Sequence, residues 1–165
     1  MLITYYDAYS VLSKVYGNKA FIKQAFLDTV IEEKCGMTIP EIFERYGEKY
    51  FRDVEKEVIA ELSLKSHSVI ATGGGVVLDS DNIATLRKNA TIVNLEPSDD
   101  VIKVRLSKDD GTRPLNKGQD IEQILERFSG RKPFYDNCDV KVKITTDMRI
   151  EDSVQAVLDG LEGKI

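Results

Sequence analysis

The feature that most constrains the fold is an alternation of short apolar runs with helical patterns. Runs typical of strands lie at 68–72 (SVIAT), 91–95 (TIVNL) and 140–144 (VKVKI), and helical patterns lie at 79–88, 98–106, 120–128 and 150–161. Strands separated by helices form parallel sheets covered by helices on both faces. We therefore predict an α/β fold, a three-layer parallel sheet flanked by helices, with ligands bound beyond the carboxyl ends of the strands.

The first half of the chain predicts helices. Thr38 and Glu41 have the spacing of a capping box, and apolar residues recur at helical spacing from there to Gly47. A second amphipathic helix is predicted over 48–64. The stretch 19–34 also has the pattern of one amphipathic helix, which Gly36 would end.

Composition limits the class of protein. The chain of 165 residues is 42% hydrophobic and 31% charged, which predicts one domain over 1–165. A net charge of -5 disfavours a nucleic-acid partner, and no apolar run has the length of a membrane span, so we expect a cytoplasmic protein that binds a small molecule as a monomer. Two cysteines, Cys35 and Cys138, and a single histidine, His67, disfavour a disulfide framework or a zinc site.

Two features in the middle of the chain suggest a site for an anionic ligand. Gly73, Gly74 and Gly75 directly follow a predicted strand, where backbone N–H groups can approach a ligand without side-chain obstruction. Arg52 and Glu55 stand at i and i+3 on one helix face, where the acid can hold the guanidinium for a carboxylate. The alternatives are a flexible turn for the glycines and an ordinary surface ion pair for the arginine.

Two further arginines lie toward the C-terminus. Arg113 lies in a polar loop at about 108–117, of the kind that closes over a phosphoryl group, although a solvated loop charge is the alternative. Arg131 precedes Pro133, which we expect to end the helix and to leave the arginine at its terminus, pointing outward. Instead of binding a ligand, Arg131 would cap that helix or pair with an acid such as Asp136.

These motifs together resemble a known family. The segments GMTIPEIFERYGEKYFRDVEKEV, VIATGGGVVL, TRPL and RKPFY, in this order and at these separations, are similar to those of shikimate kinases. The resemblance covers about 28–158 and implies a nucleoside-monophosphate-kinase-like fold. It also implies transfer of the γ-phosphoryl group of ATP, with Mg²⁺, to the 3-hydroxyl of shikimate.

The resemblance assigns a role to each motif residue. Arg52 and Arg131 match the arginines that hold the shikimate carboxylate, and Gly73, Gly74 and Gly75 match the loop beneath the substrate. Arg113 matches the lid arginine that closes on the phosphates. Asp28 matches the second acid of DTDxxIE, which binds substrate hydroxyls and is suited to position or deprotonate the attacking one.

The sequence departs from the family before residue 28. The phosphate-binding loop GxxGxGKS is absent, and residues 1–27 hold one glycine, Gly17. Ungapped alignment puts Phe26 where the family has its metal-supporting acid, whereas a gapped alignment sets 12–17 against the end of the family's first helix. A real divergence and an altered frame or start are the two explanations. Either way we expect weak kinase activity, the alternative being a non-catalytic shikimate-binding or degenerate kinase-like protein.

Overall fold

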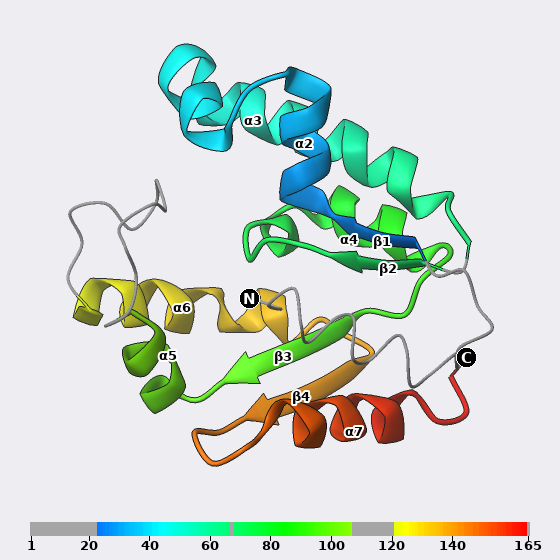
Figure 1. The fold of residues 1–165 in the computed structure, drawn as a ribbon, viewed down its shortest axis with the longest axis vertical. Coiled ribbons are helices and arrows are strands. Elements are labelled where there is room, and N and C mark those ends of the chain that lie inside the picture. The colour runs from blue at the N-terminus through cyan, green and yellow to red at the C-terminus, as the bar shows by residue number, and fades with distance from the viewer. Residues whose placement is uncertain (1–22, 67, 107–120, 165) are drawn as a thin grey trace.

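The computed structural model describes residues 23–66, 68–106 and 121–164 (Figure 1). His67, Arg113 and the predicted lid at about 108–117 lie outside this part of the chain. Helices and strands alternate through the described residues as the sequence predicts. In chain order they are β1 (Lys23–Phe26), α2 (Leu27–Cys35), α3 (Ile39–Ser63), β2 (Ser68–Ala71), the 3₁₀ helix η2 (Val76–Leu78), α4 (Ser80–Arg87), β3 (Val93–Pro97), α5 (Asp99–Leu106), α6 (Ile121–Tyr135), β4 (Val140–Ile144) and α7 (Ile150–Leu161).

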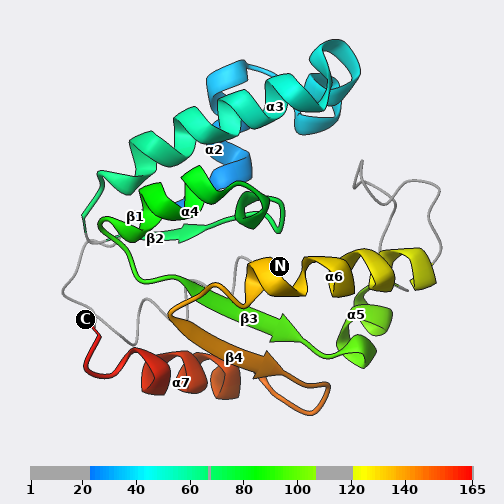
Figure 2. The ribbon, with the colours of Figure 1, turned by 180° about the vertical axis from the view of Figure 1, so that it is seen from behind.

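The strand pairs of the described residues are parallel. β1 pairs with β2, from Lys23 opposite Ser68 to Phe26 opposite Ala71, and β3 pairs with β4 over the whole length of both strands. Figures 1 and 2 show the arrows of all four strands pointing to the same side of the molecule. The predicted class, a parallel sheet flanked by helices, is confirmed, with the described strands arranged as two two-stranded sheets.

Each sheet has its own core. Figures 1 and 2 show α2, α3 and α4 grouped with β1 and β2, and α5 and α7 grouped with β3 and β4. Aliphatic side chains with no exposed surface fill the first core: Leu27, Ile31, Ile42, Val58 and Ile59. The second core is built on the alternation in β4, which buries Val140, Val142 and Ile144 against Val157 of α7 and leaves Lys141 and Lys143 exposed.

The predicted capping box at Thr38 and the helical segments that follow it are confirmed. Thr38 Oγ1 accepts from the Glu41 N–H, and Glu41 Oε2 accepts from the Thr38 N–H at 2.8 Å, which completes the capping box at the start of α3. Gly47 interrupts α3 with φ 78° and ψ 175°, a conformation that a side chain would strain. α3 therefore consists of two helical segments that meet at Gly47.

Three sequence predictions about elements need correction. Residues 23–34 do not form one helix, because residues 23–26 pair with β2 and α2 begins only at Leu27. β3 begins two residues later than predicted and ends at Pro97, which pairs with Ile144 at the end of β4. β2 ends at Ala71, one residue before the end of the predicted run 68–72, and Ala71 is its one buried residue.

The end of α6 also differs from the prediction. The helix continues through Pro133 to Tyr135, so Arg131 lies one turn before the helix end rather than at it. Pro133 removes the N–H that would donate to the Ser129 carbonyl, but losing one bond near a terminus costs less than it would in the helix interior. The hydroxyl of Tyr135 bonds outside the helix and holds this last turn against the neighbouring loop.

Candidate functional site

The candidate site contains the guanidinium of Arg52 on α3, which is fixed by two carboxylates of the same helix. Its Nη1 donates to Glu55 Oε2 at 2.9 Å, and its Nη2 donates to Glu48 Oε1 at 3.0 Å. The Glu55 side chain is 3% exposed, whereas that of Glu48 is 55% exposed. The i, i+3 spacing predicted the contact with Glu55; the contact with Glu48, at i−4, was missed, although the sequence shows that spacing too.

Burial and charge act against each other in this cluster. Burial raises the pKa of the Glu55 carboxyl, and the hydrogen bond from Arg52 only partly offsets it. Burial also works against the charge of Arg52, but the hydrogen bonds to Glu55 and Glu48 outweigh it, so the guanidinium pKa lies above its ordinary value. A half-buried arginine held by one buried and one exposed carboxylate is more than an ordinary surface ion pair.

The glycine loop lies directly against Arg52. A Cβ built on Gly75 would stand 2.6 Å from Nη1 of Arg52, so this position has room only for glycine while the guanidinium keeps its place. A Cβ on Gly73 would lie 3.6 Å from Oδ1 of Asp28. The loop therefore lies between the arginine of α3 and the aspartate of α2.

Asp28 lies in the first turn of α2, directly after β1. Because β1 runs parallel to β2, Asp28 and the glycine loop follow neighbouring carboxyl ends of one sheet, where α/β proteins bind ligands. Asp28 is exposed on one side, and the protein packed around its other side, followed by the Glu32 carboxylate, raises its pKa. The structure thus places Asp28 beside the glycine loop.

α6 brings a third group to the loop. The Tyr135 hydroxyl donates to the Gly74 carbonyl at 3.0 Å. Arg131 lies one helical turn earlier, at i−4, and so shares the helix face of Tyr135. Burial, followed by the charge of Arg131, lowers the pKa of Arg127, which lies four residues before Arg131 on the same helix.

Asp136, the alternative partner of Arg131, interacts with two lysines instead. Asp136 accepts from Lys141 and lies 3.8 Å from the Lys132 ammonium group. Within the described residues, no ion pair joins Arg131 to an acidic side chain. The roles of Tyr135 and Arg127 were missed from the sequence, although both lie at intervals of four residues from Arg131.

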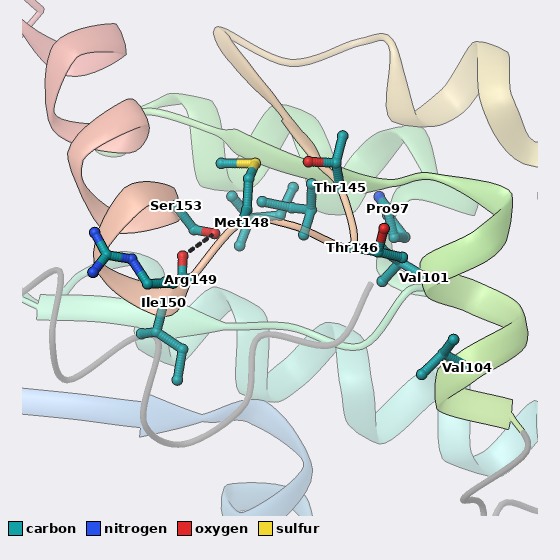
Figure 3. Close-up of a pocket in the computed structure, with 11 residues that line it drawn as sticks. Pro97, Val101, Val104, Thr145, Thr146, Met148, Arg149, Ile150 and Ser153 are labelled. Carbon is teal, nitrogen blue, oxygen red and sulfur yellow. Dashed lines mark hydrogen bonds between the residues drawn. The ribbon is translucent and has the colours of Figure 1, made fainter.

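A cavity lies beyond the carboxyl ends of β3 and β4 (Figure 3). Its volume is about 430 Å³, within the range of small-molecule sites. Thr145 and Thr146 follow β4 at its rim, and Ser153 donates to the Arg149 carbonyl at 3.3 Å. The remaining walls are mostly aliphatic. They comprise Leu95, Pro97, Val101, Val104, Ile144, Met148 and Ile150.

The described residues contain neither a metal-binding cluster of acidic, histidine and cysteine side chains nor a membrane-spanning helix. No group of three or more histidine, cysteine, aspartate or glutamate side chains in 23–66, 68–106 and 121–164 is arranged to hold a metal ion. No helix in the same part of the chain is long and apolar enough to cross a membrane. Cys35 and Cys138 are free thiols, both partly exposed.

Comparison with known proteins agrees with these motifs. The family model described as shikimate kinase matches residues 12–162. A shikimate kinase of Caldicellulosiruptor bescii is 42% identical over 135 residues, which are 81% of this chain and 77% of that protein. Sequence similarity at this level makes the chain a kinase of the transferase class.

Solved structures agree as well. The shikimate kinase of Aquifex aeolicus matches with a TM-score of 0.75 and 32% identity over 96% of this chain and 89% of its own. The shikimate kinase of Acinetobacter baumannii in complex with shikimate matches with a TM-score of 0.80 and 29% identity over 94% of this chain and 84% of its own. By sequence and by fold, the chain belongs to the shikimate kinase family.

Proposed function

We propose that this chain transfers the γ-phosphoryl group of ATP to the 3-hydroxyl of shikimate. The observation that supports this most is the convergence on one glycine loop of Arg52, Asp28 and the α6 face that carries Arg131. Cationic groups on two sides and a carboxylate beside the loop suit a hydroxylated carboxylic acid. The protein acts in the cytoplasm as a monomer, as expected for an acidic chain with a small-molecule substrate.

Each group has one role in this proposal. Arg52 and Arg131 donate to the substrate carboxylate from opposite sides, and Gly73, Gly74 and Gly75 leave room for the ring. Asp28 accepts hydrogen bonds from the hydroxyls and takes the proton of the one that attacks. Its pKa, raised by the surrounding protein and by Glu32, favours that proton transfer.

The nucleotide takes the neighbouring position. The cavity beyond β3 and β4 is mostly aliphatic with a few polar groups, which suits a flat heteroaromatic base such as adenine. It faces the same side of the molecule as the glycine loop, because all four strands point that way. Arg113, outside the described residues, is proposed to close on the phosphates.

Mg²⁺ would stabilise the charge of the transferred phosphoryl group. Mg²⁺ prefers oxygen ligands and usually takes one or two carboxylates, with water and phosphate oxygens completing its shell. Asp28, which lies in the first turn of α2 beside the glycine loop, would supply one such carboxylate. The other roles proposed for the described residues, binding of the substrate carboxylate and proton transfer, do not involve the metal ion.

The experiment is a coupled assay of ADP release by the full chain with ATP, Mg²⁺ and shikimate. We expect turnover that depends on shikimate, at a low rate because the sequence lacks GxxGxGKS. Release of ADP at the same rate with and without shikimate would refute the proposed reaction.

The missing loop also favours a second candidate, a protein that binds shikimate without phosphorylating it. Calorimetry with shikimate alone and with ATP alone, combined with the ADP-release assay, separates the two. Shikimate binding without shikimate-dependent ADP release would support the second candidate, and binding of neither shikimate nor ATP would exclude both.

A further inference from the structure

Tyr135 joins two segments that are 61 residues apart in sequence. Its hydroxyl on α6 donates to the Gly74 carbonyl at 3.0 Å, in a half-buried position. The acceptor belongs to a loop of three consecutive glycines, which has no side chains of its own to fix its conformation. A hydrogen bond to the main chain is therefore a direct way to hold this loop in place.

The two ends of this bond lead to the two carboxylate-binding arginines. On the α6 side, Arg131 is one helical turn from Tyr135 on the same face. On the loop side, Gly75 follows Gly74 and packs against the Arg52 guanidinium, with 2.6 Å between Nη1 and the position of a Cβ. The Tyr135 hydroxyl thus connects the helix that carries one arginine to the loop that touches the other.

We infer that Tyr135 is a positioning residue, which sets the separation between Arg131 and Arg52 through its hydrogen bond to the Gly74 carbonyl. The separation of two guanidiniums decides whether both can bond one carboxylate at the same time, so a small displacement loses one of the charge-assisted bonds. The inference rests on the proposed function in one respect, namely that the carboxylate belongs to shikimate.

The test compares Tyr135→Phe with Tyr46→Phe in the full chain. Both substitutions remove one phenolic oxygen, but Tyr46 is 52% exposed and its ring packs, tilted, against that of Tyr50, with the two centroids 4.7 Å apart. Amide hydrogen exchange then follows the Val76 N–H, which donates to the Gly73 carbonyl at 3.4 Å. We expect exchange there to become about three- to tenfold faster in Tyr135→Phe, and to stay unchanged in Tyr46→Phe.

Calorimetry with shikimate alone gives the second readout. We expect Tyr135→Phe to raise the Kd for shikimate by about three- to tenfold. In an Arg131→Lys background the same substitution should have a much smaller effect, because the arginine geometry that Tyr135 sets is already lost. Such non-additivity is the signature of two residues that act together.

Other outcomes overturn the inference. Unchanged exchange at Val76 would show that Tyr135 does not hold the loop, and equal effects of Tyr135→Phe in both backgrounds would show that it does not act through Arg131. If the unsubstituted chain binds no shikimate, the proposed function fails, and the exchange measurement alone decides whether Tyr135 positions the loop.

Discussion

The Arg52 guanidinium occupies the space that a side chain on Gly75 would need. A Cβ at that position would lie 2.6 Å from Nη1, 2.9 Å from Nη2 and 3.1 Å from Cζ of Arg52. The contact is with the far end of a flexible side chain, so the arginine, not the backbone, would move. Glycine is therefore needed at position 75 because the Arg52 guanidinium occupies the space of a side chain, and not because the backbone has an unusual φ angle.

The first prediction follows from that contact. Gly75→Ala should displace the guanidinium and weaken shikimate binding by about 1.5 to 3 kcal/mol, the range for a hydrogen bond to a charged group. Its melting temperature should also fall, because the buried Glu55 carboxylate would lose the guanidinium that pairs with it. The measurements are calorimetry and thermal unfolding.

Gly130→Ala is the matched control. Gly130 lies within α6, and a Cβ there would meet nothing within 4 Å. Alanine should leave shikimate affinity unchanged and increase stability by about 0.4 to 1 kcal/mol. Equal affinities in Gly75→Ala and Gly130→Ala would contradict the proposed role of Arg52.

The second prediction concerns Arg131. Arg131→Ala should weaken shikimate binding by about 1.5 to 3 kcal/mol with little change in stability. Arg131→Lys should restore only part of the affinity, because an ammonium group cannot form the bidentate pair. If Arg131 instead stabilises the end of α6, alanine will lower the melting temperature and leave the calorimetric affinity as it was.

The third prediction is a pH dependence that comes from Glu55. Burial raises the pKa of this carboxyl in the folded protein above the ordinary 4.5, so the folded state holds the proton more tightly than the unfolded chain. The Glu55 contribution to the free energy of unfolding is then fully present below about pH 4.5 and falls as pH rises through the folded-state pKa.

Glu55→Gln removes this titration. The free energy of unfolding of the unsubstituted chain minus that of the variant should therefore be larger at about pH 4 than at about pH 7, as measured by urea unfolding. Glu48→Gln, which removes the exposed partner of the same guanidinium, serves as the control. A difference that grows toward neutral pH would mean that the ion pair with Arg52 dominates over burial.

The fourth prediction tests the core of the first sheet. Leu62 is 1% exposed and Leu64, two residues later, is 80% exposed. Leu62→Ala should lower the free energy of unfolding by about 2 to 5 kcal/mol, through lost burial and the cavity left behind. Leu64→Ala should change it by no more than about 0.5 kcal/mol, as checked by urea unfolding.

Local signals in the sequence predicted the elements they control. The capping box at Thr38 and the alternation in β4 depend on residues that are close together in the sequence, so both can be predicted from the sequence alone. Arg52 and Glu55 were found for the same reason, since their spacing on one helix decides their contact.

Features that depend on distant partners were missed. Residues 23–26 have helical periodicity, and only their pairing with Ser68–Ala71 makes them a strand. Pro133 predicted a helix end, whereas α6 continues to Tyr135, whose hydroxyl bonds to a carbonyl 61 residues away. The cavity beyond β3 and β4 likewise forms only when two strands and two helices come together.

The pairing of the strands bears on how the chain is made as well as on what it binds. Among the elements that the structure describes, α2 and α3 lie between β1 and β2 in the chain, and α5 and α6 lie between β3 and β4, so neither described pair contains a strand from the other half. Chains emerge from the ribosome amino-terminus first, slowly compared with the formation of helices and short loops. The pairing that brings Asp28 to the glycine loop can therefore be complete before the strands of the second half have been synthesised.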